Sequence, residues 1–266
     1  MNKAGKALIE LRQMDELADM ESPVHSIHAL IKLIVTITYI VLVVSFHKYD
    51  FTGLLIMVIY PLFLFNLSGV PIKTCFYKLR LIIPLVCMVG VFNPIFDREV
   101  LVHVGNVGIS GGVISMITLM MKGVFSLMAS FLLISTTKID ALCAGLRMVK
   151  CPSMLVTLTL LTYRYISVLT EEVAIMSDAY HLRAPGQKGV HYKAWGSFLG
   201  QLLLRSMDRA DELYNSMQLR GFAGEFYYAD RKRIGVKDII YLIVWVGIFF
   251  FFRYVNVIGL IGNMIF

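Results

Sequence analysis

Long apolar runs and short polar connections alternate along the first half of the chain, and one more apolar run lies near its end. The runs cover residues 29–46, 51–67, 81–92, 112–135 and 239–255. A helix that crosses the hydrocarbon core of a bilayer needs about 20 predominantly apolar residues. The third run is shorter than this, so it is either extended by Phe76 and Tyr77 or re-enters the membrane. The pattern predicts an all-α polytopic membrane protein with about five transmembrane helices.

The segment 136–237 has a different character, because charged side chains recur in it at helical spacing and uninterrupted apolar runs are few. We therefore expect three regions: an N-terminal membrane region at 1–135 with about four spans, a polar block at 136–237, and a C-terminal span at 238–266. A polar insertion of this size between membrane spans indicates a binding partner or a chemistry of its own.

The polar block predicts two long amphipathic helices. The first starts after Pro152, because proline is favoured in the first turn of a helix. It runs to about Arg183, where Ala184-Pro185-Gly186 ends it. At 1.5 Å per residue this helix is a rod of roughly 45 Å. Its apolar seam alternates steps of four and three residues: Leu155, Thr159, Thr162, Ile166, Leu169, Val173, Met176 and Tyr180.

The second helix of the polar block is predicted from about Lys193 to Arg220, and Gly221 ends it. Small residues in its seam allow close approach of a second helix backbone, so we expect the two long helices to pack on each other. The seam consists of Leu199, Leu203, Ser206, Ala210, Leu213 and Met217.

Both long helices end in the same way, with Leu182-Arg183-Ala184 and with Leu219-Arg220-Gly221. An arginine near a helix C-terminus interacts favourably with the helix dipole, and a small residue beyond it is a common stop, so each motif alone has a structural explanation. The repetition on two stiff rods favours a second role. A guanidinium presents five donors in a planar fork, which suits acidic or carbonyl-lined grooves of a partner.

Composition supports the bilayer as the solvent of this chain. Of the 266 residues, 58% are hydrophobic and only 16% are charged, which is too apolar for an ordinary soluble domain. The net charge of +7 raises the alternative of nucleic-acid binding, but the basic residues lie beside apolar runs and serve orientation instead. We expect no nucleic-acid partner.

The basic residues also predict the orientation in the membrane. Lys73, Lys78 and Arg80 lie in the connection between the second and third runs without any acidic residue. Because short cytoplasmic loops are enriched in lysine and arginine, this connection is expected inside the cell. The N-terminus and the block 136–237 are then cytoplasmic as well, in a multi-pass protein of the cell membrane.

Two other chemistries compete with a binding role. Asp208 and Asp211 share one helical face, as in metal-dependent membrane transferases, but Arg205 and Arg209 flank them and no second acidic motif occurs, so a solvated surface is the simpler reading. The glycine-rich segment 105–112 lacks the Lys-Ser/Thr ending of a phosphate-binding loop, and we expect it to be a flexible connection into the fourth span.

Three further residues attract attention as ligands or buried charges. His25 and His28 share a helical face, but two imidazoles are too few for a metal site and lie before the first span, so no metal or cofactor is expected. Lys122 lies inside the fourth apolar run, where an ammonium group needs a partner or water. It either contacts another subunit or lies close enough to the interface to snorkel.

Several motifs together resemble one known family. The first is His28-x-x-x-Lys32 at the entry to the first span, and the second is Asn93-Pro94-Ile95-Phe96-Asp97. The most specific run lies in the polar block: Thr162-Tyr163-Arg164-Tyr165, Glu171-Glu172, Arg183, Leu204-Arg205-Ser206, Arg209-Ala210, Met217 and Leu219-Arg220-Gly221-Phe222-x-Gly224. The chain resembles the T component, the transmembrane coupling subunit, of energy-coupling factor (ECF) ABC transporters, and within it the CbiQ-like proteins of cobalt transport.

The resemblance implies a non-catalytic subunit without cofactors. In that family two coupling helices end in X-Arg-X motifs, and each motif docks on one cytoplasmic ABC ATPase. By position these motifs are Leu182-Arg183-Ala184 and Leu219-Arg220-Gly221, although many relatives have alanine before the arginine. ATP-driven motion would pass to a separate membrane substrate-binding subunit, with cobalt as cargo and nickel or a vitamin as alternatives. Supporting positions on the coupling helices are Arg164, Glu171, Glu172, Arg205 and Arg209.

Overall fold

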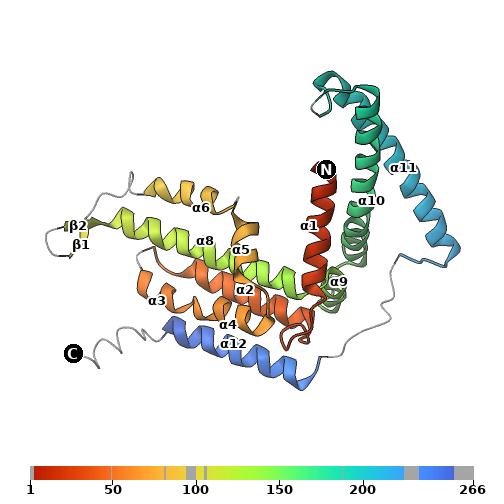
Figure 1. Ribbon diagram of the computed structural model, residues 1–266. Coiled ribbons are helices and arrows are strands. Elements are labelled where there is room, and N and C mark those ends of the chain that lie inside the picture. Colours follow the sequence, from red (N-terminus) through yellow and green to blue (C-terminus); the bar gives the residue numbers. More distant parts are fainter. Residues whose placement is uncertain are drawn as a thin grey trace. The chain divides into compact units, whose positions relative to one another are not determined.

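The computed structural model describes residues 3–48, 50–80, 82–93, 100–104, 107–187, 189–224 and 234–254. Helices make up most of this part of the chain, which confirms the predicted all-α class (Figure 1). The helices before the polar block are α1 (Lys3–Ala18), α2 (Ala29–Ser45), α3 (Phe51–Ile56), α4 (Ile59–Ser68), α5 (Ile72–Leu79), α6 (Ile82–Val91) and α8 (Gly111–Thr136). The later ones are α9 (Ile139–Met148), α10 (Ser153–Arg183), a 3-10 turn η1 (Tyr192–Ala194), α11 (Trp195–Leu219) and α12 (Val236–Tyr254).

The chain divides into two compact units. The arm unit comprises Met1–Glu16 and Ile139–Arg231, and the membrane unit comprises Leu17–Lys138 and Lys232–Phe266. The long helices α10 and α11 belong to the arm unit, whereas α2 to α8 and α12 belong to the membrane unit.

Two helices in the described part of the chain, α8 and α10, are long and apolar enough to cross a membrane. A third crossing results if residues Gly53–Ser68 and α5, which are bent by 118° relative to each other, form one broken span. The apolar helices α2 and α6 are shorter, and α12 carries charged residues in its first and last turns. These helices support a polytopic membrane protein, and the number of about five spans stays a prediction.

The core of the membrane unit lies where α2 packs against α8 and α12. Buried aromatic rings fill the space beside α2: the Tyr60 ring centroid is 4.5 Å from that of Tyr39, 4.8 Å from Trp245 and 5.0 Å from Phe249. Tilted and edge-on aromatic pairs of this kind add to the packing energy of their buried area. Tyr60 therefore connects α2, α4 and α12.

The second predicted span, 51–67, is broken into α3 and α4, with a turn at Met57 and Val58. Pro61 explains the break, because it lacks the N–H that would bond to the carbonyl of Met57 and its ring crowds that carbonyl. The hydroxyl of Tyr39 donates a hydrogen bond of 2.9 Å to the Met57 oxygen instead. A buried tyrosine thus satisfies the acceptor that the proline leaves open.

The connection into the fourth span is a β-hairpin, where we expected a flexible segment. Strands β1 (Val100–Val104) and β2 (Val107–Ser110) pair antiparallel, with Val104 opposite Val107 and an irregularity between Val100 and Val102. The residues between the strands, 105–106, and the predicted Asn93–Asp97 loop from residue 94 onward lie outside the described residues.

The long helix α10 begins and ends as predicted, at Ser153 after Pro152 and at Arg183. A small cluster of Cys143, Val156 and Leu160 is the buried core beside its N-terminal half. The predicted seam is displaced by one position there, because Leu155 is 54% exposed whereas Val156 is only 3% exposed. Burial raises the pKa of the Cys143 thiol, and nearby Asp140 adds to the shift.

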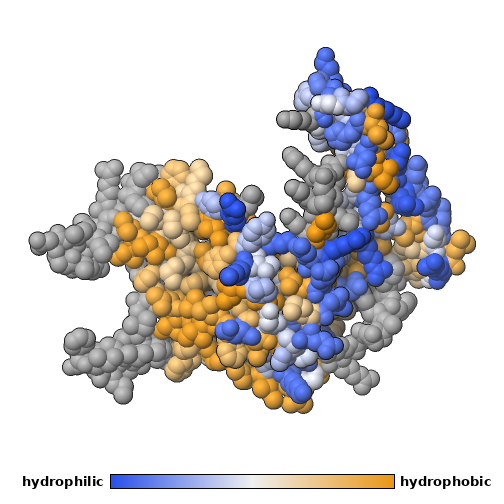
Figure 2. Space-filling view, in the orientation of Figure 1, coloured by the Kyte–Doolittle hydropathy of each residue, from blue (hydrophilic) through white to orange (hydrophobic). Residues whose placement is uncertain are grey.

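Helix α11 also follows its predicted range, and η1 precedes it. None of its residues is buried, and the predicted seam residues Leu199 and Leu203 are exposed, so this part of the seam does not face α10. Figure 2 shows apolar side chains gathered over helices of the membrane unit and hydrophilic ones over much of α10 and α11.

Candidate functional site

The end of α10 presents Leu182 and Arg183 to solvent. Leu182 is 85% exposed, and Arg183 is exposed beside it. The helix stops at Ala184, whose N–H donates to the Tyr180 carbonyl at 3.0 Å, and Gly186 follows with φ of +90°. The turn is secured by a hydrogen bond of 2.8 Å between the Tyr180 hydroxyl and the side-chain amide oxygen of Gln187. The tip is therefore an ordered helix end.

The end of α11 presents Leu219 and Arg220 in the same way. Leu219 is 90% exposed, and Arg220 is the exposed cap residue. Gly221 has φ of +78°, its N–H donates to Gln218 at 2.9 Å, and the Phe222 N–H donates to the Met217 carbonyl at 2.9 Å. These two bonds define a Schellman motif, which requires a left-handed residue at the glycine position. The glycine has a structural role that leaves the leucine and arginine free to contact a partner.

The two tips share a chemistry. Leu182 and Leu219 are among the most exposed large apolar side chains in the described part of the chain. A leucine in water beside an arginine gains when a partner buries both, because an apolar anchor next to a guanidinium resembles the residues that dominate protein interfaces. The geometry suits docking of each tip into a groove of a partner.

The supporting positions form ion pairs within the arm unit. Arg205 of α11 pairs with Glu172 of α10, which joins the two long helices. Arg164 lies 3.6 Å from Asp140 of α9, and Arg209 lies 3.3 Å from Glu212 within α11. The remaining position, Glu171, pairs with Arg12 of α1 at 3.6 Å. All of these charges are at least partly exposed, so each pair alone contributes little to stability.

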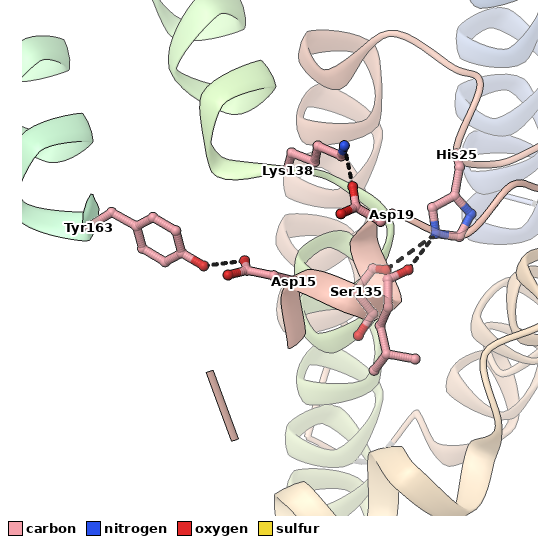
Figure 3. A network of polar contacts seen from close by, with 7 residues as sticks. Asp15, Asp19, His25, Ser135, Lys138 and Tyr163 are labelled. Atoms are coloured by element: carbon pink, nitrogen blue, oxygen red, sulfur yellow. Dashed lines mark hydrogen bonds and ion pairs between the residues drawn. The ribbon is translucent and has the colours of Figure 1, made fainter. Parts of the chain in front are cut away.

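Helix α1 adds contacts to α10 that the motif analysis missed. The Tyr163 hydroxyl of α10 donates to the Asp15 carboxylate of α1 (Figure 3). Together with Arg12–Glu171 this contact holds one side of α10 at positions eight residues apart. Glu171 and Tyr163 were visible as polar residues in the sequence, but their partners lie more than a hundred residues away.

Of the alternative acidic pair, only Asp208 lies at an open cavity between α10 and α11. This cavity has a volume of about 270 Å³ and is lined by Val168, Leu169, Glu172, Arg205, Asp208, Arg209 and Glu212. Asp208 faces it together with two arginines, whereas Asp211 is exposed and does not line it. The described residues contain no group of three or more His, Cys, Asp or Glu side chains arranged to hold a metal ion. The arrangement resembles a solvated charged surface.

Lys122 is bound to the end of a neighbouring helix. Its Nζ donates to the carbonyl of Val44 at 3.1 Å and to that of Phe46. Arg253 of α12 donates to the intervening Ser45 carbonyl at 3.0 Å, and its guanidinium lies 4.3 Å from the centroid of the Phe46 ring. The three carbonyls at the C-terminus of α2 thus receive two cations, which suits the negative end of a helix dipole. Lys122 has a structural partner inside this chain.

His25 and His28 also have structural partners. The His25 Nδ1 is 2.7 Å from the Ser22 hydroxyl, and its Nε2 is 3.0 Å from the Leu17 carbonyl. The His28 Nδ1 accepts from the Leu30 N–H at 3.2 Å and caps α2. Three of the four ring nitrogens of this pair thus contact groups of the protein.

Comparisons with known proteins identify the family of the chain. The model of the cobalt transport protein family CbiQ matches residues 20–228. The chain is 31% identical over 123 residues to the nickel permease LarQ of Lactiplantibacillus plantarum, covering 45% of each protein. It is 33% identical over 94 residues to the cobalt transport protein CbiQ of Rhodobacter capsulatus, covering 35% of this chain and 38% of that protein.

A third relative matches over a longer stretch. The chain is 26% identical over 192 residues to an uncharacterized protein of Methanocaldococcus jannaschii, covering 68% of this chain and 66% of the relative. The alignments thus span between about two fifths and two thirds of these relatives' own lengths. The family match is broader, since residues 20–228 include both long helices with their tips. The chain belongs to the CbiQ family of cobalt transport proteins.

Proposed function

We propose that this chain is the transmembrane coupling subunit of an ECF-type ABC importer. In this role two cytoplasmic ATPases dock on α10 and α11, and their ATP-driven motion passes through the membrane helices to a separate membrane substrate-binding subunit. ATP hydrolysis belongs to the partner subunits, and this chain has no catalytic residue of its own.

The observation that carries the proposal is the pair of exposed Leu-Arg tips. Leu182-Arg183 and Leu219-Arg220 each end a helix of 25 residues or more, and both leucines are at least 85% exposed. Two long helices suit the transmission of a displacement, because loops would absorb it by changing their own dihedral angles. Two matching tips suit two copies of the same kind of partner.

The electrostatics of the tips support an ATPase groove lined by carbonyl or carboxylate oxygens. An arginine at the C-terminal end of a helix is oriented by the negative end of the helix dipole, and its five donors extend beyond the last turn. The neighbouring leucine adds an apolar contact with the groove, which the polar contacts of the arginine do not provide. Supporting ion pairs, above all Arg205–Glu172, join the two helices that would be moved.

The proposed topology follows from the same role. The N-terminus and residues 136–237 are cytoplasmic, residues 1–135 carry about four spans, and residues 238–266 carry the last one. Exposed apolar side chains on the membrane unit, such as Ile37 at 52%, Val41 at 60% and Leu85 at 63%, support contact with lipid or with a membrane partner in the cell membrane.

Cobalt is the cargo that we propose, on the strength of the family description. Nickel is the second candidate, because the similar stretch of LarQ belongs to a protein described as a nickel permease. The cargo is selected by the substrate-binding subunit in this scheme, so the coupling mechanism is the same for both ions.

Docking is tested with charge-reversed tips. We would express the chain with its membrane partners, solubilise it in detergent and capture it through an affinity tag. Wild-type protein should retain an ABC ATPase and a small membrane protein, identified by mass spectrometry. The double variant Arg183→Glu/Arg220→Glu should lose the ATPase and keep the membrane protein, since both tips would repel acidic or carbonyl-lined grooves.

The matched control reverses an arginine away from the tips. Arg80→Glu changes the net charge by the same amount per site, at an exposed residue that ends α5 in the membrane unit. It should leave the ATPase bound. Retention of the ATPase by the double tip variant, at the level of wild type, would contradict the docking role of α10 and α11.

A further inference from the structure

The chain passes between the arm unit and the membrane unit three times. The division falls between Glu16 and Leu17, between Lys138 and Ile139, and between Arg231 and Lys232. The backbone therefore joins the long helices to the membrane helices at these three crossings. The contacts on the membrane-unit side of each crossing therefore decide which membrane helices respond.

One histidine contacts the backbone near both of the first two crossings. The Nε2 of His25 lies 3.0 Å from the Leu17 carbonyl and 3.3 Å from the Ser135 carbonyl, in the last turn of α8 (Figure 3). Since both neighbours of Nε2 are acceptors, this nitrogen carries the proton and donates. Beside it, the Lys138 ammonium pairs with the Asp19 carboxylate. The residues that follow the first crossing, Asp19 and His25, are thereby connected to the residues that precede the second crossing, Lys138 and Ser135.

A buried lysine connects the same end of α8 to α2. Lys32, in the first turn of α2, is 5% exposed, and its Nζ donates to the carbonyl of Thr136. The carbonyls of Ser135 and Thr136, which a helix end leaves without intrahelical partners, are therefore taken by His25 and Lys32. A displacement of the end of α8 pulls on α2 directly.

A buried carboxylate connects the start of α12 to the start of α2. Asp238, in the first turn of α12, is 5% exposed. One of its oxygens accepts the backbone N–H of His28 at 2.8 Å, and the other accepts the N–H of Gly235 at 2.8 Å. His28 is the cap of α2, so the start of α12 is joined to the start of α2.

We propose that these residues form an anchor that makes α2, α8 and α12 respond as one to motion of the arm unit. The anchor consists of Asp19, His25, Lys32, Lys138 and Asp238. Its members are positioning residues, and they act by holding the end of α8 and the starts of α2 and α12 together. The inference rests on the proposed coupling function, and it identifies the residues that transmit motion of the arm unit to the membrane helices.

The burial of Lys32 and Asp238 supports a mechanical role, because charged groups that only aid solubility are exposed to water. A lysine and an aspartate that are 95% buried among apolar helices carry a large desolvation cost, which is offset only while their hydrogen bonds persist. Separating the helix ends would break the Lys32–Thr136 and Asp238–His28 hydrogen bonds while both charged groups remain buried. The network therefore resists relative motion of the helix ends much more strongly than apolar packing of the same area would.

The experiment compares docking with coupling in the assembled complex. We would reconstitute the complex with its ATPases into proteoliposomes and measure ATPase co-purification, ATP hydrolysis and uptake of Co²⁺, with Ni²⁺ as the second ion. Lys32→Met should retain the ATPases and continue hydrolysis but lower uptake about tenfold, within the usual range of coupling effects. Lys32→Arg should restore uptake, and Lys73→Met, at an exposed lysine of α5, should not change it.

A second set of variants uses the exposed ion pair, whose members are 57% and 61% exposed, so that folding tolerates the change. Asp19→Lys and Lys138→Asp should each lower uptake per ATP hydrolysed about threefold, as expected for a partly exposed pair. The exchanged pair Asp19→Lys/Lys138→Asp should recover it. These variants decide the matter if Lys32→Met does not reach the membrane.

The outcomes separate the two proposals. Wild-type uptake per ATP in both single reversals, or no recovery in the exchanged pair, would overturn the anchor while leaving ATPase docking at the tips intact. Absence of ATPases from the wild-type complex would instead reject the coupling function itself.

Discussion

Truncation of one leucine offers the most direct test of the docking surface. Leu219 is 90% exposed in the isolated chain, so Leu219→Ala removes almost no contact from the folded protein. If a partner groove covers this side chain, its full burial is worth about 2 kcal/mol. A loss of that size raises the dissociation constant for the ATPase about 30-fold.

The same change should leave the stability of the chain alone. Surface substitutions away from special backbone features usually shift the free energy of unfolding by no more than about 0.5 kcal/mol. Leu219 is followed by the Schellman motif at Gly221, but the hydrogen bonds of that motif come from backbone atoms, and alanine preserves them. Binding and stability are thus expected to separate clearly.

The assay is a titration of purified, dye-labelled ATPase with the detergent-solubilised chain, followed by fluorescence anisotropy. Thermal unfolding of each variant, measured in the same detergent, reports stability. Leu203→Ala is the matched control, because Leu203 is also on α11 and 61% exposed, yet lies about 24 Å from the tip along the helix axis. An equal affinity of the Leu219→Ala variant and wild type would refute the reasoning, as would an equal loss in the Leu203→Ala control.

Three further outcomes follow from the described geometry. Asp238→Asn replaces an acceptor of buried N–H groups and should lower the free energy of unfolding by about 2 kcal/mol, measured by thermal denaturation in detergent. Gly221→Ala meets no neighbouring atoms but strains a φ of +78°, so in the same measurement it should lower the free energy of unfolding by about 1 kcal/mol, whereas Gly196→Ala should not. Burial raises the pKa of the Cys143 thiol. The contribution of this thiol to the stability of the fold is therefore complete below the ordinary thiol pKa of about 8.5 and is lost as the pH rises above it. In the folded protein, mass spectrometry should find that iodoacetamide alkylates Cys143 more slowly than Cys151.

The limits of the long helices could be predicted because local signals mark them. Pro152 precedes α10, the Ala184-Pro185-Gly186 segment follows it, and Gly221 follows α11. Each of these residues restricts the backbone within one turn, so neighbouring residues alone determine the helix end. The positions of Arg183 and Arg220 at the tips follow from the same signals.

Other features had a local signal that the interpretation passed over. Pro61 lies inside the second apolar run and breaks it into α3 and α4, although the run looks continuous by hydropathy. Valines alternate with other residues at 100, 102 and 104 before a Gly-Asn pair, which is typical of a hairpin. The glycines of residues 105–112 predict flexibility instead, because glycine restricts the backbone least.

The partners of the buried charges had no local signal. Lys32 meets a carbonyl 104 residues away, and Asp238 meets the backbone of a residue 210 positions away. Composition and periodicity describe one helix at a time, so they indicate that a charge needs a partner without indicating which helix end supplies it. The choice of face on α10 fails for the same reason, since a seam shifted by one residue has nearly the same periodicity.

Helices α2 and α8 are joined by two lysines, one from each helix. Lys32 near the start of α2 reaches the last carbonyls of α8, and Lys122 of α8 reaches the last carbonyls of α2. Sliding either helix by one turn, about 5.4 Å, would detach both lysines at once. The antiparallel pair therefore has a single register, and it can tilt or rotate as one body but does not shear along its own axis.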